Sequence, residues 1–482
     1  MTAVAPASAG RLLRIEIKRS AAVWALPLLA ALFLYDPFRT ASGYPAVWDV
    51  RASVVPNKML SYFIPFTAAF AAWAGSREGR RRMADLVTST AWPAWARQAA
   101  AFTATAALFV LPFLAGVAAL YIQTARVVTW GGPPLWPVAV SVVTLTAVCA
   151  VGFTAGALFP GRFTTTLVTV GVSFVELVTF QESVSQSGPL ALALLSPSTA
   201  VPPTDSGVFY PDAPDLAIVQ VMFMAGIAIA ALGVLALFKA RGARQARTTA
   251  IAVVAAAVAL AGTAVGLAAT ATHGVSGWDI PALHDAASDR PIPYTPVCAG
   301  TGLRVCMHPA FSYYLDDTAA DLAPVAAEIA GLPGAPARGE EVDSVALAST
   351  GGNGVITGNR PVYQFSMNTM LDLSGFQETN FREILQQDLL DAFVAPSAAR
   401  NAGVSDTPSY APAQQAVVIA LMRAVGSRPT SNSPFAYNSP INAQVAMAAD
   451  RFAALPPAAR HAWLITHLAA LRAGLVTLAG IP

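Results

Sequence analysis

Residues 215–238 read DLAIVQVMFMAGIAIAALGVLALF, a run that carries no charged side chain after Asp215. A helix of this length can cross the hydrocarbon core of a bilayer, which requires about 20 apolar residues. A surface helix of a soluble protein would place polar residues along one face, whereas here Gln220 is the main polar interruption. The stretch therefore predicts a transmembrane helix.

The same pattern recurs on both sides of this run, because the chain is 55% apolar and only 12% charged. Soluble domains carry about 25% charged residues, so the deficit is typical of membrane proteins. From residue 273 onward the composition returns to that of a water-soluble domain. We therefore expect an α-helical polytopic membrane protein of about seven transmembrane helices, followed by a mixed α/β domain. The expected spans are residues 21–35, 59–75, 99–123, 136–159, 164–180, 215–238 and 250–272.

Basic residues are distributed unevenly between alternate connections of these spans. Fourteen lysine and arginine side chains lie on the N-terminal side, whereas the opposite side holds four. Because cytoplasmic loops carry the excess of positive charge, we expect a cytoplasmic N-terminus in the cell membrane and a C-terminal domain on the extracytoplasmic side. The expected units are a cytoplasmic interfacial helix at 1–20, a six-span unit at 21–240, a seventh span at 241–272 and an extracytoplasmic domain at 273–482.

Two cysteines, Cys298 and Cys306, lie close together in the C-terminal domain. The intervening Ala-Gly-Thr-Gly predicts a turn that would bring them together across a short hairpin. Disulfides form outside the cytoplasm, so a bridge agrees with the side of the membrane that the basic residues indicate. Closing so short a loop would contribute roughly 2–3 kcal/mol in the chain-entropy model. Two free thiols are the alternative.

The C-terminal domain is expected to combine a few strands with helices that gather in its second half. Its last helix has the clearest signals, since Pro456 and Pro457 stand at its start and Gly474 follows its end. The expected strands are Leu303–His308, Val342–Ala348 and Val362–Asn368, and the expected helices are Thr318–Gly331, Glu378–Phe393, Pro412–Val425, Ile441–Ala454 and Pro456–Ala473.

The N-terminal segment Arg11-Leu12-Leu13-Arg14-Ile15-Glu16-Ile17-Lys18-Arg19-Ser20 stands directly before the first span. Its basic residues at i, i+3 and i+7 share one helical face and its apolar residues cluster elsewhere. Helices of this kind lie in the headgroup layer of the membrane. A plain basic flank that sets the topology is the alternative.

The connection after the second span, residues 73–90, is basic in its first half and amphipathic in its second. Apolar side chains at i, i+3, i+4 and i+7 would form one face of a short helix, which suits docking on a partner protein. An ordinary positively charged loop is the alternative. The residues expected to make this contact are Arg77, Arg80, Arg81, Arg82, Met83, Leu86 and Val87.

With these two segments, the six-span count and a long outer loop at 181–214, the first ~240 residues resemble permease subunits of type-2 ABC exporters. The resemblance implies that residues 76–95 form a coupling helix for an ATPase subunit, and that permease subunits pair as homo- or heterodimers. The chain contains no Gly-x-x-x-x-Gly-Lys-Ser/Thr motif. ATP would therefore bind a separate P-loop ATPase subunit, and this chain would hold no cofactor. The seventh span and the C-terminal domain depart from the family's plan.

Glu176 is the one acidic residue well inside an expected span. An intramembrane carboxylate is a candidate for a proton or cation path. It lies about one turn from the outer end of its span, however, so a side chain that reaches the membrane interface is the alternative.

The C-terminal domain shows none of the catalytic motifs that a hydrolase would need. His-Glu-x-x-His and Gly-x-Ser-x-Gly are both absent, and His461 and His467 stand six residues apart, unlike a ligand pair at i, i+4. His308 is expected to be a strand-end residue with local hydrogen bonds. We therefore expect no catalytic residues, no metal site and no enzymatic activity.

Three functions remain open for the chain. The sequence favours a permease subunit of an exporter that contacts membrane lipid, an ATPase and a second permease subunit. The second hypothesis is a membrane-anchored extracytoplasmic binding or regulatory protein that transports nothing, and the third is an external hydrolase of unrecognised type. Residues 273–482 carry a net charge of −6, which argues against a nucleic-acid partner.

Overall fold

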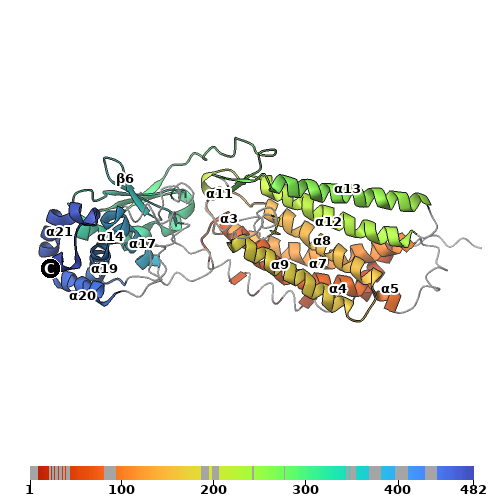
Figure 1. The fold of residues 1–482 in the computed structure, drawn as a ribbon. Coiled ribbons are helices and arrows are strands. Elements are labelled where there is room, and N and C mark those ends of the chain that lie inside the picture. Colours follow the sequence, from red (N-terminus) through yellow and green to blue (C-terminus); the bar gives the residue numbers. More distant parts are fainter. Residues whose placement is uncertain are drawn as a thin grey trace, which may run out of the picture.

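The computed structural model describes residues 9–20, 44–80, 94–185, 195–197, 206–240, 244–275, 277–343, 354–367, 381–396, 411–428 and 442–482, with a few single positions between these ranges. They form two parts, a helical bundle and a C-terminal α/β domain that stands beyond one end of it (Figure 1). We call this end of the bundle the domain end. The opposite end, where the short helix α5 (Arg77–Arg80) lies, is the far end.

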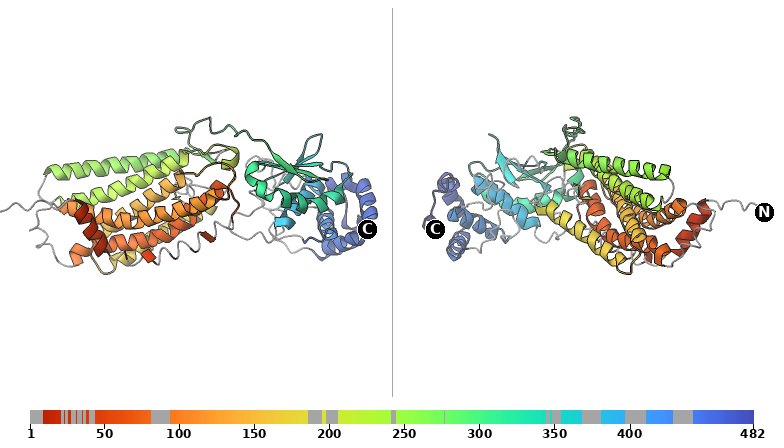
Figure 2. Two further views of the ribbon diagram at one scale, coloured as in Figure 1. Left: turned by 180° about the vertical axis from the view of Figure 1, so that it is seen from behind. Right: turned by 45° about the vertical axis from the view of Figure 1, so that its right-hand side comes forward.

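The bundle consists of long helices that run side by side between its two ends (Figure 2). Short elements flank them: α1 at the far end, and α3 and α11 at the domain end. The long helices are α4 (Leu60–Gly75), α7 (Ala94–Ala125), α8 (Trp136–Leu158), α9 (Thr164–Ser185), α12 (Asp215–Lys239) and α13 (Arg244–Ala268). The short ones are α1 (Ala9–Arg19), α3 (Trp48–Ala52), the π-helical turn η1 (Val55–Met59) and α11 (Ser206–Phe209).

Four of these helices are long and apolar enough to cross a membrane, which suggests that the chain is a membrane protein. The apolar part of α9, Thr164–Thr179, is shorter, and α4 has 16 residues. Most of the expected first span, 21–35, lies outside the described residues, so the count of about seven stays a prediction. The four long helices are Arg97–Ala125, Trp136–Leu158, Asp215–Lys239 and Arg244–Ala268.

Helices α4 and α8 approach so closely that their contact requires glycine. A methyl group on Gly152 would lie 2.8 Å from the carbonyl oxygen of Ala68, and one on Gly156 would overlap the carbonyl group of Ala72. Small residues allow such backbone contact between membrane helices, where the lipid is as apolar as the side chains and close packing must supply the attraction. The sequence therefore brings these two helices together through its smallest residues.

The C-terminal domain is built on a mixed five-stranded sheet in the order β3-β4-β5-β7-β6. Its three inner strands are parallel, and the edge strands β3 and β6 are antiparallel to their neighbours. Helix α14 connects β4 to β5, as parallel neighbouring strands require a crossover. The strands are β3 (Val297–Ala299), β4 (Arg304–Met307), β5 (Arg338–Glu341), β6 (Gly354–Thr357) and β7 (Val362–Phe365), and a separate hairpin, β1 (Thr272–Gly274) and β2 (Gly277–Asp279), follows α13.

The helices expected in this domain are present, with ends that differ by at most three residues from the expected bounds. The strand expected at Val342–Ala348 is wrong at its described positions 342, 343 and 347, and the central strand β5 begins four residues earlier. Its sequence Arg-Gly-Glu-Glu carries no apolar side chain, so strand propensity gives no signal and the neighbouring strands decide. The helices are α14 (Leu315–Ile329), α17 (Phe381–Val394), α19 (Pro412–Ala424), α20 (Ala443–Ala454) and α21 (Pro457–Arg472), with 3₁₀ turns η3 (Pro309–Tyr314) and η5 (Leu478–Gly480).

The core of the C-terminal domain continues onto the domain end of the bundle. Val47, Val50, Val208 and Phe209 belong to the bundle's end connections, yet they are buried in the same apolar cluster as the sheet and helices of the domain. The two parts therefore share a core instead of merely being tethered.

Candidate functional site

At the far end of the bundle, an ion pair ties α1 to α5. The Nη2 atom of Arg77 donates to Oε2 of Glu16 over 2.6 Å, and both side chains are largely covered. The two residues are 61 positions apart, so the contact fixes the N-terminal helix against the connection that follows α4. An amphipathic helix held in this way can lie along the end of the bundle.

The described part of the basic connection, helix α5, is attached to two long helices. The guanidinium group of Arg80 lies 3.4 Å from the ring centroid of Trp73 in α4 and also donates to its backbone carbonyl. Glu78 accepts a hydrogen bond of 2.8 Å from Gln98 in α7. We call the surface formed by Glu16, Arg77, Glu78, Arg80 and Gln98 the far-end platform.

The structure describes only part of the expected ATPase-coupling segment. Arg77 and Arg80 lie on the far-end platform, whereas Arg81, Arg82, Met83, Leu86 and Val87 lie outside the described residues. The amphipathic helix expected there stays a prediction.

Glu176 lies within α9 and is partly buried. Its carboxylate lies near Ser61 of α4, whose hydroxyl group donates to the carbonyl of Asn57. The side chain therefore faces a neighbouring helix, and its role in a proton or cation path stays a prediction.

The expected disulfide between Cys298 and Cys306 is confirmed. The two cysteines are direct partners in the antiparallel pair of β3 and β4. The bridge pins the edge strand of the sheet to its neighbour, as the hairpin interpretation requires.

At the domain end, three aromatic rings enclose the buried imidazole of His308. The ring centroids of Trp130, Phe209 and Tyr294 lie 4.7, 5.2 and 4.1 Å from that of His308. Trp130 belongs to the connection between α7 and α8 and Phe209 to α11, whereas His308 follows β4. We call these four residues the aromatic junction.

Backbone contacts reinforce the aromatic junction. The hydroxyl group of Thr129 donates to the carbonyl of Pro309 over 3.3 Å, and the amide of Ile292 donates to the carbonyl of Phe209 over 2.7 Å. The junction therefore joins the bundle and the C-terminal domain through side chains and main chain together.

The chemistry of His308 follows from its burial. Its Nδ1 atom accepts a hydrogen bond of 3.1 Å from the amide of Ala310, which confirms the expected local bond at the strand end. Its Nε2 atom has no hydrogen-bond partner among the described residues. Burial lowers the pKa of His308 to about 4, so the imidazole is neutral near pH 7.

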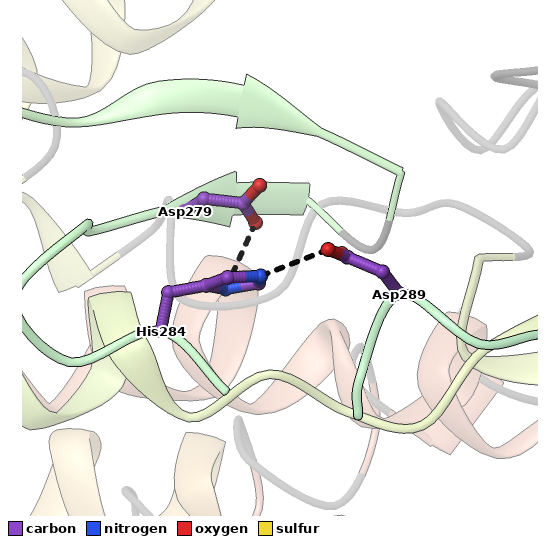
Figure 3. Close-up of side chains that lie close together, drawn as sticks. All are labelled: Asp279, His284 and Asp289. Atoms are coloured by element: carbon purple, nitrogen blue, oxygen red, sulfur yellow. Dashed lines mark hydrogen bonds and ion pairs between the residues drawn. The ribbon is translucent and has the colours of Figure 1, made fainter. Parts of the chain in front are cut away.

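A second histidine, His284, lies among carboxylates between β2 and β3 (Figure 3). Its Nε2 atom is 3.1 Å from Oδ2 of Asp289, and its Nδ1 atom is 3.5 Å from Oδ1 of Asp279 and 3.3 Å from Oδ2 of Asp215. The hydrogen bond with Asp289 and the negative charges of Asp279, Asp289 and Asp215 raise the pKa of His284. One potential ligand atom each from Asp279, His284 and Asp289 lies within 4.8 Å of the others.

The sequence patterns considered above do not reveal this cluster, because they concern pairs of ligands that share one helix. Of the histidines in those patterns, His461 lies 2.9 Å from the carbonyl of Ala330 and His467 lies 2.9 Å from that of Trp463. His284 instead lies in a loop, and its partner Asp215 lies at the start of α12, 69 residues earlier in the chain. The regular spacing of five residues between Asp279, His284 and Asp289 was the available signal.

No family model, curated protein or solved structure matches the chain. The far-end platform and the domain-end contacts are therefore the features that bear on function.

Proposed function

We propose that the chain is the membrane-spanning permease subunit of an ATP-driven exporter, which works as a dimer with a separate P-loop ATPase. The ion pair between Glu16 and Arg77 carries the proposal, because it joins the interfacial helix to the basic connection. In this proposal the far end is cytoplasmic, in line with its excess of arginine, and the C-terminal domain is extracytoplasmic.

The far-end platform suits a part that receives force from a partner. Residues 81–93 follow α5, which Arg80 attaches to α4 and Glu78 attaches to α7 through its bond with Gln98. A partner that pulls on this connection would move both α4 and α7, because α5 is bonded to each of them. Arg81 and Arg82 would add positive charge to this connection, which would attract an acidic groove on the ATPase.

At the domain end, the aromatic junction would pass movement of the bundle to the C-terminal domain. Trp130 follows α7, the same helix that Gln98 opens at the far end. A shift of α7 along its axis would therefore reach both the platform and the junction. The C-terminal domain would then receive or gate the cargo after it has crossed.

Co-purification from native membranes tests the proposal. A P-loop ATPase is expected to co-purify with the tagged chain in mild detergent. Arg77→Glu places two negative charges opposite each other and is expected to reduce ATPase retention, while the double variant with Glu16→Arg restores it. Arg338→Glu is the control, because it reverses the charge of an arginine that also pairs with a glutamate, Glu340, but at a more exposed position in the C-terminal domain.

Two outcomes would contradict the proposal. One is the absence of any P-loop ATPase from the purified complex. The other is a retention that stays the same in the wild type, in the single variant and in the charge-swapped double variant. Either outcome would favour the membrane-anchored binding or regulatory protein.

A further inference from the structure

We propose that Asp279, His284 and Asp289 bind a divalent transition-metal ion of the zinc class, with Asp215 as the buried carboxylate that orients the imidazole. The site would lie at the domain end of the bundle, where the chain leaves α13 and enters the C-terminal domain. It is independent of the exporter function proposed above.

The ligand set and its spacing suit such an ion. Zinc takes histidine nitrogen and carboxylate oxygen at about 2.0–2.2 Å, so its ligand atoms stand roughly 3–3.5 Å apart. The 3.1 Å between Nε2 of His284 and Oδ2 of Asp289 is of this size. The Oδ1 atom of Asp279 lies 3.5 Å from Nδ1, the other ring nitrogen, so this carboxylate would turn toward Nε2 when the ion binds. One ligand atom from each of the three residues already lies within 4.8 Å of the others. Three carboxylates surround one imidazole, so even a protonated His284 would leave an excess of negative charge for a cation to neutralise.

The buried residue Asp215 supports the site independently of the three ligands. Its side chain is only 1% exposed, and its Oδ2 atom accepts a hydrogen bond of 3.1 Å from the amide of Ile280. The same oxygen faces Nδ1 of His284, while its Oδ1 atom has no hydrogen-bond partner among the described residues. A carboxylate behind a histidine fixes the tautomer in many zinc sites, and here it would hold the proton on Nδ1 and leave Nε2 for the metal.

The backbone leaves room for the second ligand. A methyl group on Gly274 would overlap the carboxylate of Asp279, so this carboxylate occupies the space that a side chain would fill. Asp279 and His284 are largely covered, at 17% and 16% exposure, whereas Asp289 is 43% exposed and faces the entry side. A metal ion can therefore enter from solvent beside Asp289 and meet two further ligands that are largely covered.

Binding would lock the start of α12 to the segment after α13. Ile280, which bonds to Asp215, is buried in an apolar cluster with Leu216 and Val219 of α12 and with Ala264 and Ala268 of α13. The metal ion would lie at the polar edge of this apolar cluster. It would thereby set the direction in which the chain enters the C-terminal domain.

The competing arrangement has no metal: a protonated His284 would donate to Asp289 and to the carboxylates on its other side. Both arrangements explain the same distances, and metal titration separates them. The full chain in detergent, freed of metal with a chelator, is titrated with Zn²⁺ by calorimetry and with Co²⁺ by visible absorption. The proposal expects one equivalent of Zn²⁺ per chain and a Co²⁺ spectrum characteristic of mixed nitrogen and oxygen ligands.

Four variants sharpen the test. His284→Ala and Asp289→Asn each remove a ligand and are expected to weaken Zn²⁺ binding by at least 10-fold, and Asp289→Asn, at an exposed position, should leave the fold intact. Asp215→Asn is expected to weaken binding by about 10- to 100-fold without removing the Co²⁺ band, since it acts through His284. Asp285→Asn is the control, because its Oδ1 caps the amide of Ala287 and asparagine preserves that bond.

The proposal is overturned if the wild-type chain shows no saturable 1:1 binding of Zn²⁺. It is also overturned if Asp289→Asn, folded as judged by an unchanged melting temperature, binds Zn²⁺ as tightly as the control. Either result would assign the cluster to the protonated-histidine arrangement.

Discussion

The helical bundle and the C-terminal domain differ in the side chains that they expose. Among the described residues, 23 large apolar side chains are exposed in the bundle and its end connections, against four from residue 277 onward. In the most apolar 18-residue stretch of α12, only 22% is buried within the protein, and in that of α13 only 17%. The four exposed side chains of the C-terminal domain are Tyr313, Met447, Ile465 and Leu475.

The difference shows that the two parts are built for different solvents. Contiguous apolar surface is unfavourable in water, so the bundle needs an apolar medium around it. Where water supplies no hydrophobic drive between helices, close backbone contact must hold them, as at Gly152 and Gly156. The C-terminal domain instead buries large side chains such as Tyr363, Phe365 and Phe393 in a common core.

The largest expected effect comes from emptying the core of the C-terminal domain. Phe365 is fully buried, and its ring stacks on Tyr363 with a centroid distance of 5.5 Å. Phe365→Ala is expected to lower the free energy of unfolding by about 4 kcal/mol, because it removes apolar contact and leaves a cavity. Thermal unfolding of the full chain in detergent measures this. Tyr313→Ala, at a residue that is 79% exposed, is the control and should change little.

Adding volume at a close contact between helices should lower the stability of the bundle. Gly156→Ala adds a methyl group where the carbonyl of Ala72 already lies, and we expect a loss of up to about 3 kcal/mol. Gly262→Ala in α13 has open space around it and serves as the control. If both variants melt at the same temperature in detergent, the close contact of α4 and α8 does not stabilise the bundle.

A smaller effect is expected from pH at the aromatic junction, where the two parts meet. The folded pKa of His308 is about 4 and the unfolded value about 6.5, so the unfolded chain binds the extra proton between these values. Stability is therefore complete above pH 6.5 and is lost as the pH falls toward 4. The relation predicts a loss of about 2 kcal/mol from pH 7 to pH 5.

His308→Asn tests the assignment of this pH dependence. Asparagine can still accept from the amide of Ala310 but does not titrate, so the melting temperature should depend less on pH than in the wild type. Tyr294 and Glu341, which also lie near His308, keep their places in this variant. An unchanged pH dependence would show that other groups cause it.

The sequence predicts the parts of this fold that depend on local pattern. The apolar runs that became α7, α8, α12 and α13, and the helices of the C-terminal domain, are visible because periodicity and proline or glycine signals act within a few residues. The hairpin of Cys298 and Cys306 is visible for the same reason. Strand β5 is not, because Glu341 is buried there through its bond to the amide of His308, 33 residues away.

The candidate sites follow the same division. Arg77 and Arg80 stand out by local charge, whereas the partner of Arg77 is 61 residues distant and no pattern points to it. His308 is recognisable as a strand end, yet its enclosure by Trp130 and Phe209 depends on how the bundle meets the domain. Long-range contacts of this kind are set by the whole fold.

One measurement tests most directly whether the C-terminal domain and the far end of the bundle lie on opposite sides of the membrane. Single cysteines are introduced as Tyr313→Cys in the C-terminal domain and Arg244→Cys at the far end, and intact cells are treated with a membrane-impermeant maleimide. The native Cys149 is buried and Cys298 and Cys306 form a disulfide, so labelling reports the accessibility of the introduced thiols. We predict labelling of Tyr313→Cys in intact cells and of Arg244→Cys only after the membrane is opened. Equal labelling of both in intact cells, or the reverse order, would contradict the account.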